Sequence, residues 1–414
     1  MWTDRRSMEV LVVGAGASGM MAAISAAGMG AYVTICEKED IAGRKILRTG
    51  NGKCNLGNRE LRTDYYHSSD NELLDAYFSK FDEEDTIRTF RSMGLIIKES
   101  GGLFYPFCEQ ASVVRDVLLS NIEAYGIKVL YDTYPEKIVK VKPDRFEVTF
   151  DGRTREYDRV ILACGSYAGI DKKDRLPSDI DGYSLAYSLG HTVIPVKPAL
   201  TALNCKGDFW KEISGVRAEA LIKLTCDDSY IGCEYGEVQF TDTGISGIPV
   251  FQLSHYVGAN PDRSYSAVLD LMPGLDEDEY ISLMQNRMLA FQGHKVRDFV
   301  IGTINSKLGE YIASLAGLNM DDAIGDSTED KIIEFVGLIK CFKVDIKNTK
   351  DFTHSQCCSG GIPLRETDDN CQSVKTPGLY ICGEMLDVDG ACGGYNLQWA
   401  WTSGYIAGRA AGSY

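Results

Sequence analysis

Three glycines near the N-terminus have the spacing G-x-G-x-x-G, and an acidic residue follows them. The glycines are Gly14, Gly16 and Gly19, and Glu37 lies 18 residues after the last of them. In such a motif the first glycine permits a tight turn, the second lets the backbone approach a pyrophosphate, and the third lets a helix pack closely on a strand. The acid can accept hydrogen bonds from ribose hydroxyls, and its charge would repel a 2′-phosphate. We therefore predict a dinucleotide site at the start of the following helix.

A segment rich in glycine and basic residues follows the acid, at positions 43–55. A flavin dinucleotide extends beyond the first strand–helix–strand unit, so a loop at this place could cover its pyrophosphate and its ring. Arg44 and Lys45 could offset the negative charge of the phosphates. The alternative is a solvated basic loop without a ligand. We interpret the segment as part of the same site.

The C-terminal part of the chain carries a second group of such residues. Gly383 and Glu384 end an apolar stretch that is typical of a buried strand, and Asp387 and two glycines at 393–394 follow. A helix predicted at 398–411 would begin at that glycine turn, so its dipole could stabilise the pyrimidine edge of an anionic reduced flavin. Asp387 could hold a ribityl hydroxyl; the alternative is a helix cap or a turn residue.

The elements that must position these residues follow from the hydrophobic pattern. Apolar, β-branched runs that end in glycine or in an acid predict buried strands of a parallel sheet. Such strands are expected at 9–14, 31–36, 157–165 and 378–384, with a helix at 20–27. A hairpin-like pair is expected at 128–141 and 145–150. In flavoproteins with two dinucleotide folds such a segment touches the adenine, and we expect Pro135 to make that contact.

The composition argues against several classes of protein. The 414 residues hold 43 Lys and Arg against 59 Asp and Glu, and the net charge of −16 disfavours nucleic acids and anionic membranes as partners. Thirteen cysteines, an odd number, without a secretion signal indicate a reducing compartment and not a disulfide framework, so we expect a cytoplasmic protein. The expected partner is a small-molecule substrate. Residues 10–36 carry no charge, but their glycines favour a strand, a turn and a helix over stable membrane insertion. The oligomeric state stays open.

Together these motifs resemble the BaiN/YhiN-like flavoproteins, also called the aminoacetone-oxidase family of FAD enzymes. The residues that carry the resemblance span nearly the whole chain and are the N-terminal glycine motif, 43–55, 181–183, 190–191, 197–200, 240–247 and 383–401. The resemblance implies an α/β fold class. It implies a Rossmann-like FAD-binding domain formed by both chain ends, with an inserted β-barrel plus α-helical region.

The middle of the chain agrees with such an insertion. Short alternating stretches at 220–225 and 265–271 are typical of barrel strands, whereas helical periods follow at 276–292, 296–316 and 328–340. Four acids among five residues open the first of these helices, as the helix dipole favours. The expected parts are an FAD-binding domain at 1–191 and 345–414, a β-barrel-like subdomain at 192–272 and a helical subdomain at 273–344.

The expected cofactor is one FAD, held without a covalent bond, because no His or Cys is placed to be tethered to the ring. NAD(P)H would dock only transiently as electron donor, since the sequence has no second G-x-G-x-x-G. No metal site is expected, because a zinc site at His354, Cys357 and Cys358 lacks an evident fourth ligand. The residues expected to contact FAD are Gly14, Gly16, Ala17, Ser18, Gly19, Glu37, Lys38, Arg44, Lys45, Gly52, Cys54, Asn55, Pro135, Cys164, Gly165, Gly383, Glu384, Asp387, Gly394, Asn396 and Leu397.

Two enzyme activities fit such a site. In a reductase, NAD(P)H would reduce the flavin, which would pass a hydride to the β-carbon of an enone while an acid protonates the α-carbon. The resemblance implies a bile-acid or steroid-like enone for this activity. In an oxidase, a small amine or an aminoketone such as aminoacetone would be the substrate and O₂ the acceptor. A flavin-bound redox sensor that uses Cys357 and Cys358 is a third alternative, and the negative charge disfavours a tRNA-modifying enzyme.

The substrate-facing region departs from the pattern of the family. Asp242 occupies a position where the family commonly has His, and Cys357, Cys358 and Ser359 replace an apolar-Thr-small run. The loop 166–180 lacks the glycine-rich character of many members. The candidate acids for the reductase are Tyr395, Cys358 and His354. These departures leave the substrate open, but they do not concern the cofactor.

Overall fold

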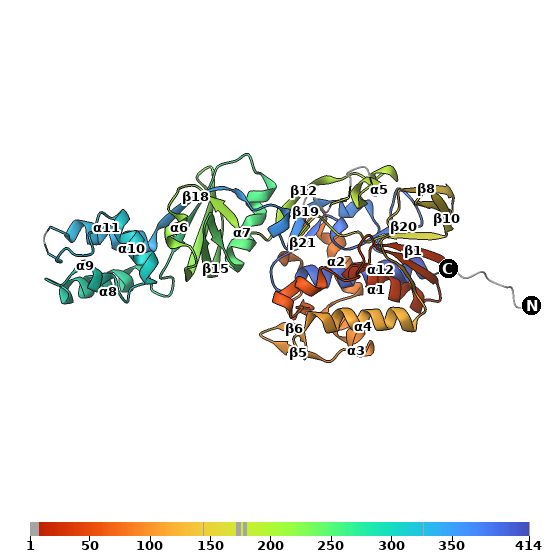
Figure 1. The fold of residues 1–414 in the computed structure, drawn as a ribbon, viewed down its shortest axis with the longest axis horizontal. Helices are drawn as coiled ribbons and strands as arrows, with labels where there is room; N and C mark the ends of the chain where they lie inside the picture. The colour runs from red at the N-terminus through yellow and green to blue at the C-terminus, as the bar shows by residue number, and fades with distance from the viewer. Residues whose placement is uncertain (1–7, 144, 171–174, 177–179, 326, 414) are drawn as a thin grey trace, which may run out of the picture. The chain divides into compact units, whose positions relative to one another are not determined.

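The computed structural model describes residues 8–143, 145–170, 175–176, 180–325 and 327–413. The chain divides into two compact units. The first unit combines the residues up to 197 with those from 357 onward, and the second consists of residues 198–356 (Figure 1). The first unit is therefore built from both parts of the chain that flank the second.

The first unit is organised around a five-stranded parallel sheet with the order β20-β11-β1-β2-β7. Its strands are β1 (Glu9–Val13), β2 (Tyr32–Cys36), β7 (Lys128–Leu130), β11 (Arg159–Leu162) and β20 (Leu379–Ile381). Strands β1, β11 and β20 are almost entirely buried, as in parallel sheets that are covered on both faces, and this explains their continuous apolar runs. Because β20 pairs with β11, the sheet itself joins the two ends of the chain.

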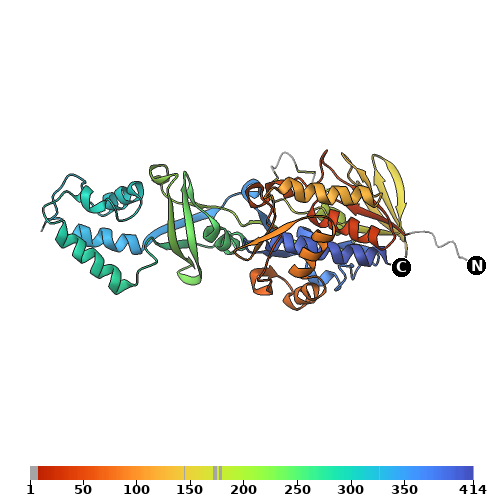
Figure 2. The same cartoon turned by 90° about the horizontal axis from the view of Figure 1, so that it is seen from below.

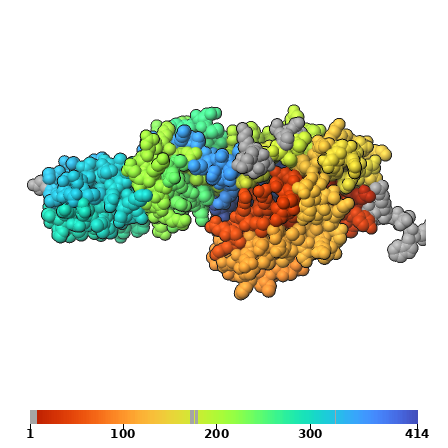
Figure 3. Space-filling model, in the orientation of Figure 1, coloured from red at the N-terminus to blue at the C-terminus, as the bar shows by residue number. Residues whose placement is uncertain are grey.

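Two helices, α1 (Ala17–Gly28) and α12 (Tyr395–Gly412), lie side by side and hold the chain ends together (Figures 1 and 2). A Cβ atom on Gly404, Gly408 or Gly412 would lie 2.2 to 2.6 Å from a backbone oxygen of α1. Glycine is unfavourable inside a helix, and here it allows the two backbones to touch. Most of α12 is buried, and N-terminal residues form most of the visible surface of this unit in Figure 3.

Smaller elements complete the first unit. Its other helices are α2 (Asn71–Lys80), α3 (Glu83–Ser92), α4 (Ala111–Ala124) and α5 (Gly182–Ser188), with the 3₁₀ segment η1 (Ile46–Gly52). Its short strands are β3 (Gly57–Asn58), β4 (Tyr66–Ser68), β5 (Ile97–Ser100), β6 (Leu103–Pro106), β19 (Cys357–Gly361) and β21 (Val388–Gly390), and β12 (Ile194–Ala199) pairs with β19.

The segment 128–141 differs from the single hairpin arm that the sequence predicted. It forms β7 in the parallel sheet and then β8 (Lys137–Lys142), which pairs with β9 (Arg145–Phe150) in an antiparallel sheet that β10 (Arg153–Tyr157) completes. Between β7 and β8 the chain turns at Asp132, whose φ is 49°. The Thr133 N–H donates to the Glu37 carbonyl oxygen at 2.8 Å, so this turn is anchored at the end of β2.

The second unit contains a closed barrel with the strand order β13-β16-β15-β14-β17-β18. The strands are β13 (Leu203–Cys205), β14 (Arg217–Cys226), β15 (Ser229–Thr241), β16 (Gly244–Ser246), β17 (Tyr265–Asp270) and β18 (Phe342–Thr349). In β17 and β18 buried and more exposed residues alternate, because successive side chains point into and out of the barrel. The helices of this unit are α6 (Trp210–Ile213), α7 (Ile248–Ala259), α8 (Glu277–Ala290), α9 (Val296–Val300), α10 (Ser306–Leu315) and α11 (Glu329–Lys340).

The predicted fold class is confirmed, and three local features differ from expectation. The helix expected at 296–316 is divided into α9 and α10, because Gly302 has a φ of 82° and Asn305 caps a new helix start. Helix α7 lies in a stretch that we expected to be strands. Strand β18 belongs to the barrel, although the expected boundary at 344–345 cuts through it. Among the described helices, none combines the length and the apolar character needed to cross a bilayer.

Candidate functional site

The N-terminal glycines occupy three different environments. Gly14 has a φ of 106°, and a Cβ there would lie 2.5 Å from the Ala163 carbonyl oxygen. A Cβ on Gly19 would lie only 1.9 Å from the Gly14 carbonyl oxygen, so Gly19 is required for the packing of α1 on β1. A Cβ on Gly16 would meet nothing within 4 Å. Gly16 therefore faces open space at the N-terminus of α1, where a pyrophosphate could approach the backbone.

Glu37 follows β2 and holds the glycine turn in place. Its Oε2 accepts the Ala15 N–H at 2.7 Å and its Oε1 accepts the Glu39 N–H at 3.0 Å. Burial raises the pKa of Glu37, and the two backbone donors partly oppose that rise. Each carboxylate oxygen keeps a lone pair that can accept a ribose hydroxyl. The neighbouring Lys38 pairs with Glu39 at 3.5 Å.

The end of β20 is fixed against the two helices that join the chain ends. Gly383 has a φ of 71°, and a Cβ there would lie 2.4 Å from the Ser18 Oγ. The Gly383 N–H donates to the Ser403 Oγ at 2.9 Å, and the Trp399 Nε1–H donates to the Gly383 carbonyl oxygen at 3.1 Å. These contacts place Gly383 beside the N-terminus of α1, although more than 360 residues separate them in sequence.

Glu384 forms an ion pair with the basic loop. Its Oε2 lies 2.6 Å from the Lys45 Nζ and accepts the Ser166 hydroxyl at 2.7 Å. Burial alone would lower the pKa of Lys45, but the Glu384 carboxylate outweighs it and the pKa of Lys45 is raised. Arg44 pairs with Glu39 at 2.7 Å. In this structure both cations that we expected to offset phosphate charge are thus engaged by carboxylates.

The turn before α12 meets the end of the basic segment 43–55 and the residues just after it. Gly394 has a φ of 97°, and a Cβ there would lie 2.9 Å from the side chain of Asn55. The Asn58 Nδ2–H donates to the Gly393 carbonyl oxygen at 3.2 Å, and Asn396 exchanges two hydrogen bonds with the backbone of Gly390. Helix α12 begins at Tyr395, about one turn earlier than predicted, and its N-terminus therefore belongs to this junction.

Comparison with known proteins identifies a family that matches nearly the whole chain. The family model described as HI0933-like protein Rossmann domain matches residues 8–410. The chain belongs to this family. It is 36% identical over 408 residues to the 3-dehydro-bile acid delta(4,6)-reductase of Clostridium scindens, with 97% of this chain and 98% of that protein covered. It is 27% identical over 406 residues to the ribosomal RNA dihydrouridine synthase of Haemophilus influenzae, with 96% of each covered.

A solved structure shows that the fold extends to distant proteins. The 3-ketosteroid delta1-dehydrogenase of Sterolibacterium denitrificans superposes with a TM-score of 0.50 at 12% identity, and the match covers 97% of this chain and 99% of that one. Family membership and the geometry of the cradle agree on the cofactor, and the protein is an FAD-dependent oxidoreductase. The open side of Gly16, the acceptors of Glu37 and the N-terminus of α12 fit the phosphates, the ribose and the ring of that cofactor.

The other residues that we expected to contact FAD lie in the same unit. Cys164 and Gly165 follow β11, where the Tyr134 hydroxyl donates to the Cys164 sulfur at 3.4 Å and burial raises the pKa of that thiol to about 12. Pro135 is buried between β7 and β8. Asp387 donates its N–H to the Ile362 carbonyl oxygen at 2.8 Å. Three further residues were expected to contact FAD. Cys54 and Gly52 both have a positive φ, and Leu397 packs on the core.

The three candidate acids lie in different surroundings. Cys358 is buried in β19, next to Ser166, and burial raises the pKa of its thiol to about 11, so it stays protonated at neutral pH. Tyr395 is buried, and its hydroxyl donates to the Glu60 carbonyl oxygen at 3.2 Å. His354 lies in the second unit, where its side chain is 63% exposed and pairs with Asp351 at 2.7 Å. Of these, Cys358 is the acid beside the Lys45–Glu384 pair.

Sequence reasoning missed several residues that build the site. Ser403 and Ser166 hold the end of β20, and Tyr134 and Asn58 support Cys164 and the glycine turn. Ser166 directly follows Gly165, so its place after a buried strand was a usable signal. No local pattern distinguishes Ser403 within an 18-residue helix. Of the loop 166–180, positions 171–174 and 177–179 lie outside the described residues.

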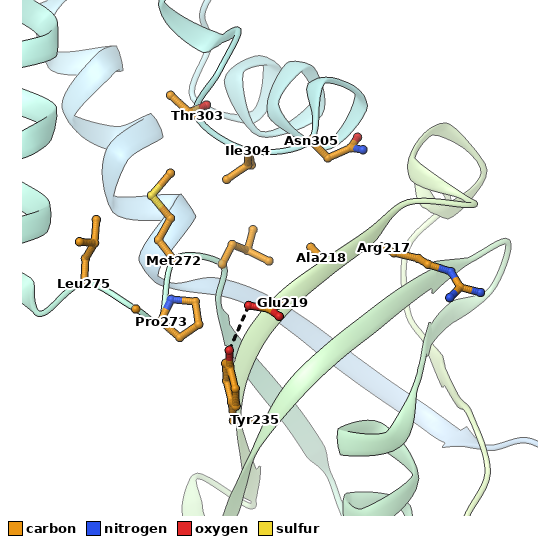
Figure 4. A pocket seen from close by; sticks show the side chains of 12 residues that line it. Arg217, Ala218, Glu219, Tyr235, Met272, Pro273, Leu275, Thr303, Ile304 and Asn305 are labelled. Atoms are coloured by element: carbon orange, nitrogen blue, oxygen red, sulfur yellow. Dashed lines mark hydrogen bonds between the residues drawn. The ribbon is translucent and has the colours of Figure 1, made fainter. Parts of the chain in front are cut away.

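The second unit also contains a pocket. A cavity of about 410 Å³ lies between the face of β14 and β15 and the loops 271–275 and 303–305 (Figure 4). On its wall the Tyr235 hydroxyl donates to the Glu219 carboxylate at 3.0 Å, and apolar side chains such as Met272 form the opposite side.

Proposed function

We propose that the protein reduces a carbon–carbon double bond conjugated to a ketone in a small steroid-like enone, with NAD(P)H as electron donor. The observation that carries this proposal is the 36% identity to a bile-acid delta(4,6)-reductase along nearly the full length of both chains. An identity of this extent covers the cofactor cradle and the inserted unit together. The negative net charge also favours a small organic substrate over a polyanion.

The chemistry requires one hydride and one proton for each double bond. FAD, when bound, supplies hydride transfer between the donor and the β-carbon. The chain must hold the cofactor, exclude water and deliver the proton that the α-carbon gains. The protonated Cys358 thiol, beside Ser166 and Glu384, is the candidate donor that lies with the cradle residues. Overall, enone, NAD(P)H and one proton give the saturated ketone and NAD(P)⁺.

A second candidate is reduction of a uracil ring in RNA, which a relative of 27% identity supports. The double bond of uracil is also conjugated to a carbonyl group, so the two activities share one reaction class. The charge of the inserted unit argues against it, because residues 198–356 hold 14 Lys and Arg against 24 Asp and Glu. Such a surface repels a phosphate backbone. Oxidation of an amine by O₂ stays a prediction from the sequence.

Anaerobic half-reactions test the proposal directly. The yellow holoenzyme is mixed with NADH or NADPH, and flavin bleaching is followed near 450 nm. The reduced enzyme is then mixed with a 3-oxo-Δ4 steroid, with uridine-containing ribosomal RNA, or with air. We expect rapid bleaching by a pyridine nucleotide and rapid reoxidation by the steroid enone. Reoxidation by RNA alone would favour the second candidate, and bleaching by aminoacetone without a pyridine nucleotide would establish the oxidase.

A further inference from the structure

One carboxylate oxygen gathers donors from segments that are far apart in the sequence. The Glu384 Oε2 accepts the Lys45 ammonium at 2.6 Å and the Ser166 hydroxyl at 2.7 Å. Lys45 and Glu384 are 339 positions apart, and they belong to the two halves of the FAD cradle. The pair therefore joins the basic loop of the N-terminal half to the end of β20 in the C-terminal half.

The two sides of this ion pair are held very differently. On the side of β20, Gly383 is bonded to Ser403 and Trp399, and the Tyr183 hydroxyl donates to the Glu384 carbonyl oxygen at 3.3 Å. The basic loop has an irregular backbone with several residues at positive φ, namely Gly43, Gly50, Asn51, Gly52 and Cys54. The start of the loop is anchored, because the Gly43 N–H donates to the Ala15 carbonyl oxygen at 2.9 Å and Ile46 is buried. The irregular backbone that follows has no continuous hydrogen-bond ladder, so its position depends on tertiary contacts.

The exposure of the pair points to positioning and not to a contribution to the core. The side chain of Lys45 is 42% exposed and that of Glu384 is 17% exposed. Because the Lys45 side of the pair stays partly open to solvent, we expect the pair to contribute only modestly to the stability of the fold. The pair can still fix how the loop rests against the end of β20, because the Lys45 ammonium reaches Glu384 only when the loop lies beside that strand end.

We propose that the Lys45–Glu384 ion pair is a clasp that closes loop 43–52 over bound FAD and sets the rate at which the cofactor leaves. The proposal rests on the FAD assignment and is independent of the substrate. Lys45 is a positioning residue in this account, since it acts through the loop that carries it. Breaking the pair frees one side of the cradle while the glycine turn and Glu37 still hold the phosphates and the ribose.

The test measures FAD release from the holoenzyme. Native protein and variants are diluted into an excess of an apoflavoprotein that captures free FAD, and the release rate is followed by flavin fluorescence. K45M and E384Q remove the charge on either side of the pair. K53M is the matched control, because Lys53 lies in the basic segment 43–55 just after loop 43–52 and forms a 2.7 Å ion pair with Glu109 of the N-terminal half. K45R keeps the charge and tests conservative rescue.

We expect K45M and E384Q to accelerate FAD release by about tenfold or more, K53M to stay within twofold of the native rate, and K45R to lie near it. Native release should also speed up between low and 1 M salt, because the ion pair is screened, whereas K45M should respond less.

A K45M release rate within twofold of the native rate, or an equal acceleration by K53M, would overturn the clasp. E384D, which keeps the charge but shortens the reach, serves if K45M does not fold, and an unchanged rate there would also overturn it. The assay uses no substrate, so a failed enone assay would leave this result standing.

Discussion

The two units of the molecule differ in the range of the contacts that close them, although the barrel of the inserted unit also needs the distant pairing of β13 with β18. The FAD unit depends on contacts between residues that are hundreds of positions apart, such as the Trp401 Nε1–H that donates to the Leu56 carbonyl oxygen at 3.0 Å. In the inserted unit, by contrast, the long strands β14 and β15 form a hairpin that closes at Cys226 and Ser229. The inserted unit is also the more acidic, with 24 acids against 14 bases, while the rest of the chain has 35 against 29. The cofactor site thus lies in the unit that depends more on contacts between residues far apart in the sequence.

The largest effect should come from breaking the packing of α12 on α1. G408V would put a side chain 2.2 Å from the Ala22 carbonyl oxygen, so the helices must separate. We expect a loss of at least about 3 kcal/mol in the free energy of unfolding and the loss of bound FAD. Chemical unfolding and flavin absorbance measure both. The control is G337A in α11, where a Cβ meets nothing within 4 Å and a gain of up to about 1 kcal/mol is expected. Retention of FAD by G408V would show that the helix contact does not close the site.

The next effect concerns a buried charge network in the FAD unit. Glu366 accepts hydrogen bonds from Lys375 at 2.6 Å and from the Thr192 N–H at 3.0 Å, and it pairs with His191 at 2.8 Å. Burial alone would raise the pKa of Glu366, but these donors lower it to about 2. As the pH falls, Glu366 is therefore protonated at a lower pH in the folded protein than in the unfolded chain. The stability that its charge provides above pH 4.5 is lost as the pH falls toward 2.

E366Q should remove that acid sensitivity. We expect a loss on the order of 2–3 kcal/mol in the unfolding free energy of the FAD unit at neutral pH, and a flatter pH dependence between about 4.5 and 2. The pKa of His191 is lowered by burial, so its protonation adds a second loss of stability below its ordinary range near pH 6.5. Hydrogen exchange at several pH values separates the two units. An unchanged acid profile in E366Q would contradict the assignment.

A smaller effect is expected at the ribose end of the cradle. E37Q replaces a carboxylate oxygen that faces a backbone N–H by an amide nitrogen, which cannot accept that bond. We expect FAD affinity to fall by about 10- to 30-fold, measured by fluorescence titration of the apoprotein, which corresponds to about 1.4–2 kcal/mol. E234Q in the inserted unit is the control, since burial raises the pKa of Glu234 as well. Equal affinities for E37Q and native protein would remove Glu37 from the site.

The smallest effect should be confined to the inserted unit. The Lys340 Nζ lies 2.7 Å from the Asp270 Oδ2 and also donates to the Met272 and Leu275 carbonyl oxygens. K340M leaves these acceptors without the ammonium, and we expect a loss of about 1–2 kcal/mol in the unfolding free energy of that unit. FAD affinity should not change. A weaker FAD affinity in K340M would mean that the two units are more strongly coupled than their separate cores indicate.

The sequence predicts the N-terminal half of the cradle well. Gly14, Gly16 and Gly19 each lie where their spacing predicts, because the strand, the turn and the helix of one βαβ unit are neighbours in sequence. The start of α12 was predicted too late. The helix begins at Tyr395 because Gly394 turns the chain against Asn55, a contact that no local pattern contains.

The partners of the C-terminal half could not be predicted from local signals. Ser403 supports Gly383 across a helix and a strand, and Lys45 finds Glu384 only after both ends have met. In the inserted unit the sequence analysis indicated the barrel strands but not α7, although the buried residues Val250, Leu253 and Val257 recur at helical spacing. The division between α9 and α10 depends on a single glycine and a cap, which the helical period of the stretch conceals.

The packing of α12 on α1 has a consequence for the order of events during synthesis. A ribosome delivers residues 198–356 before the last strand and helix of the FAD unit exist, and domains generally fold as units while the chain emerges. The barrel and its helices can therefore fold while the first 197 residues still lack the C-terminal part of their unit. The nascent chain can become a holoenzyme only after residues 379–412 have been made, so a ribosome that stalls within this segment yields a protein without its cofactor.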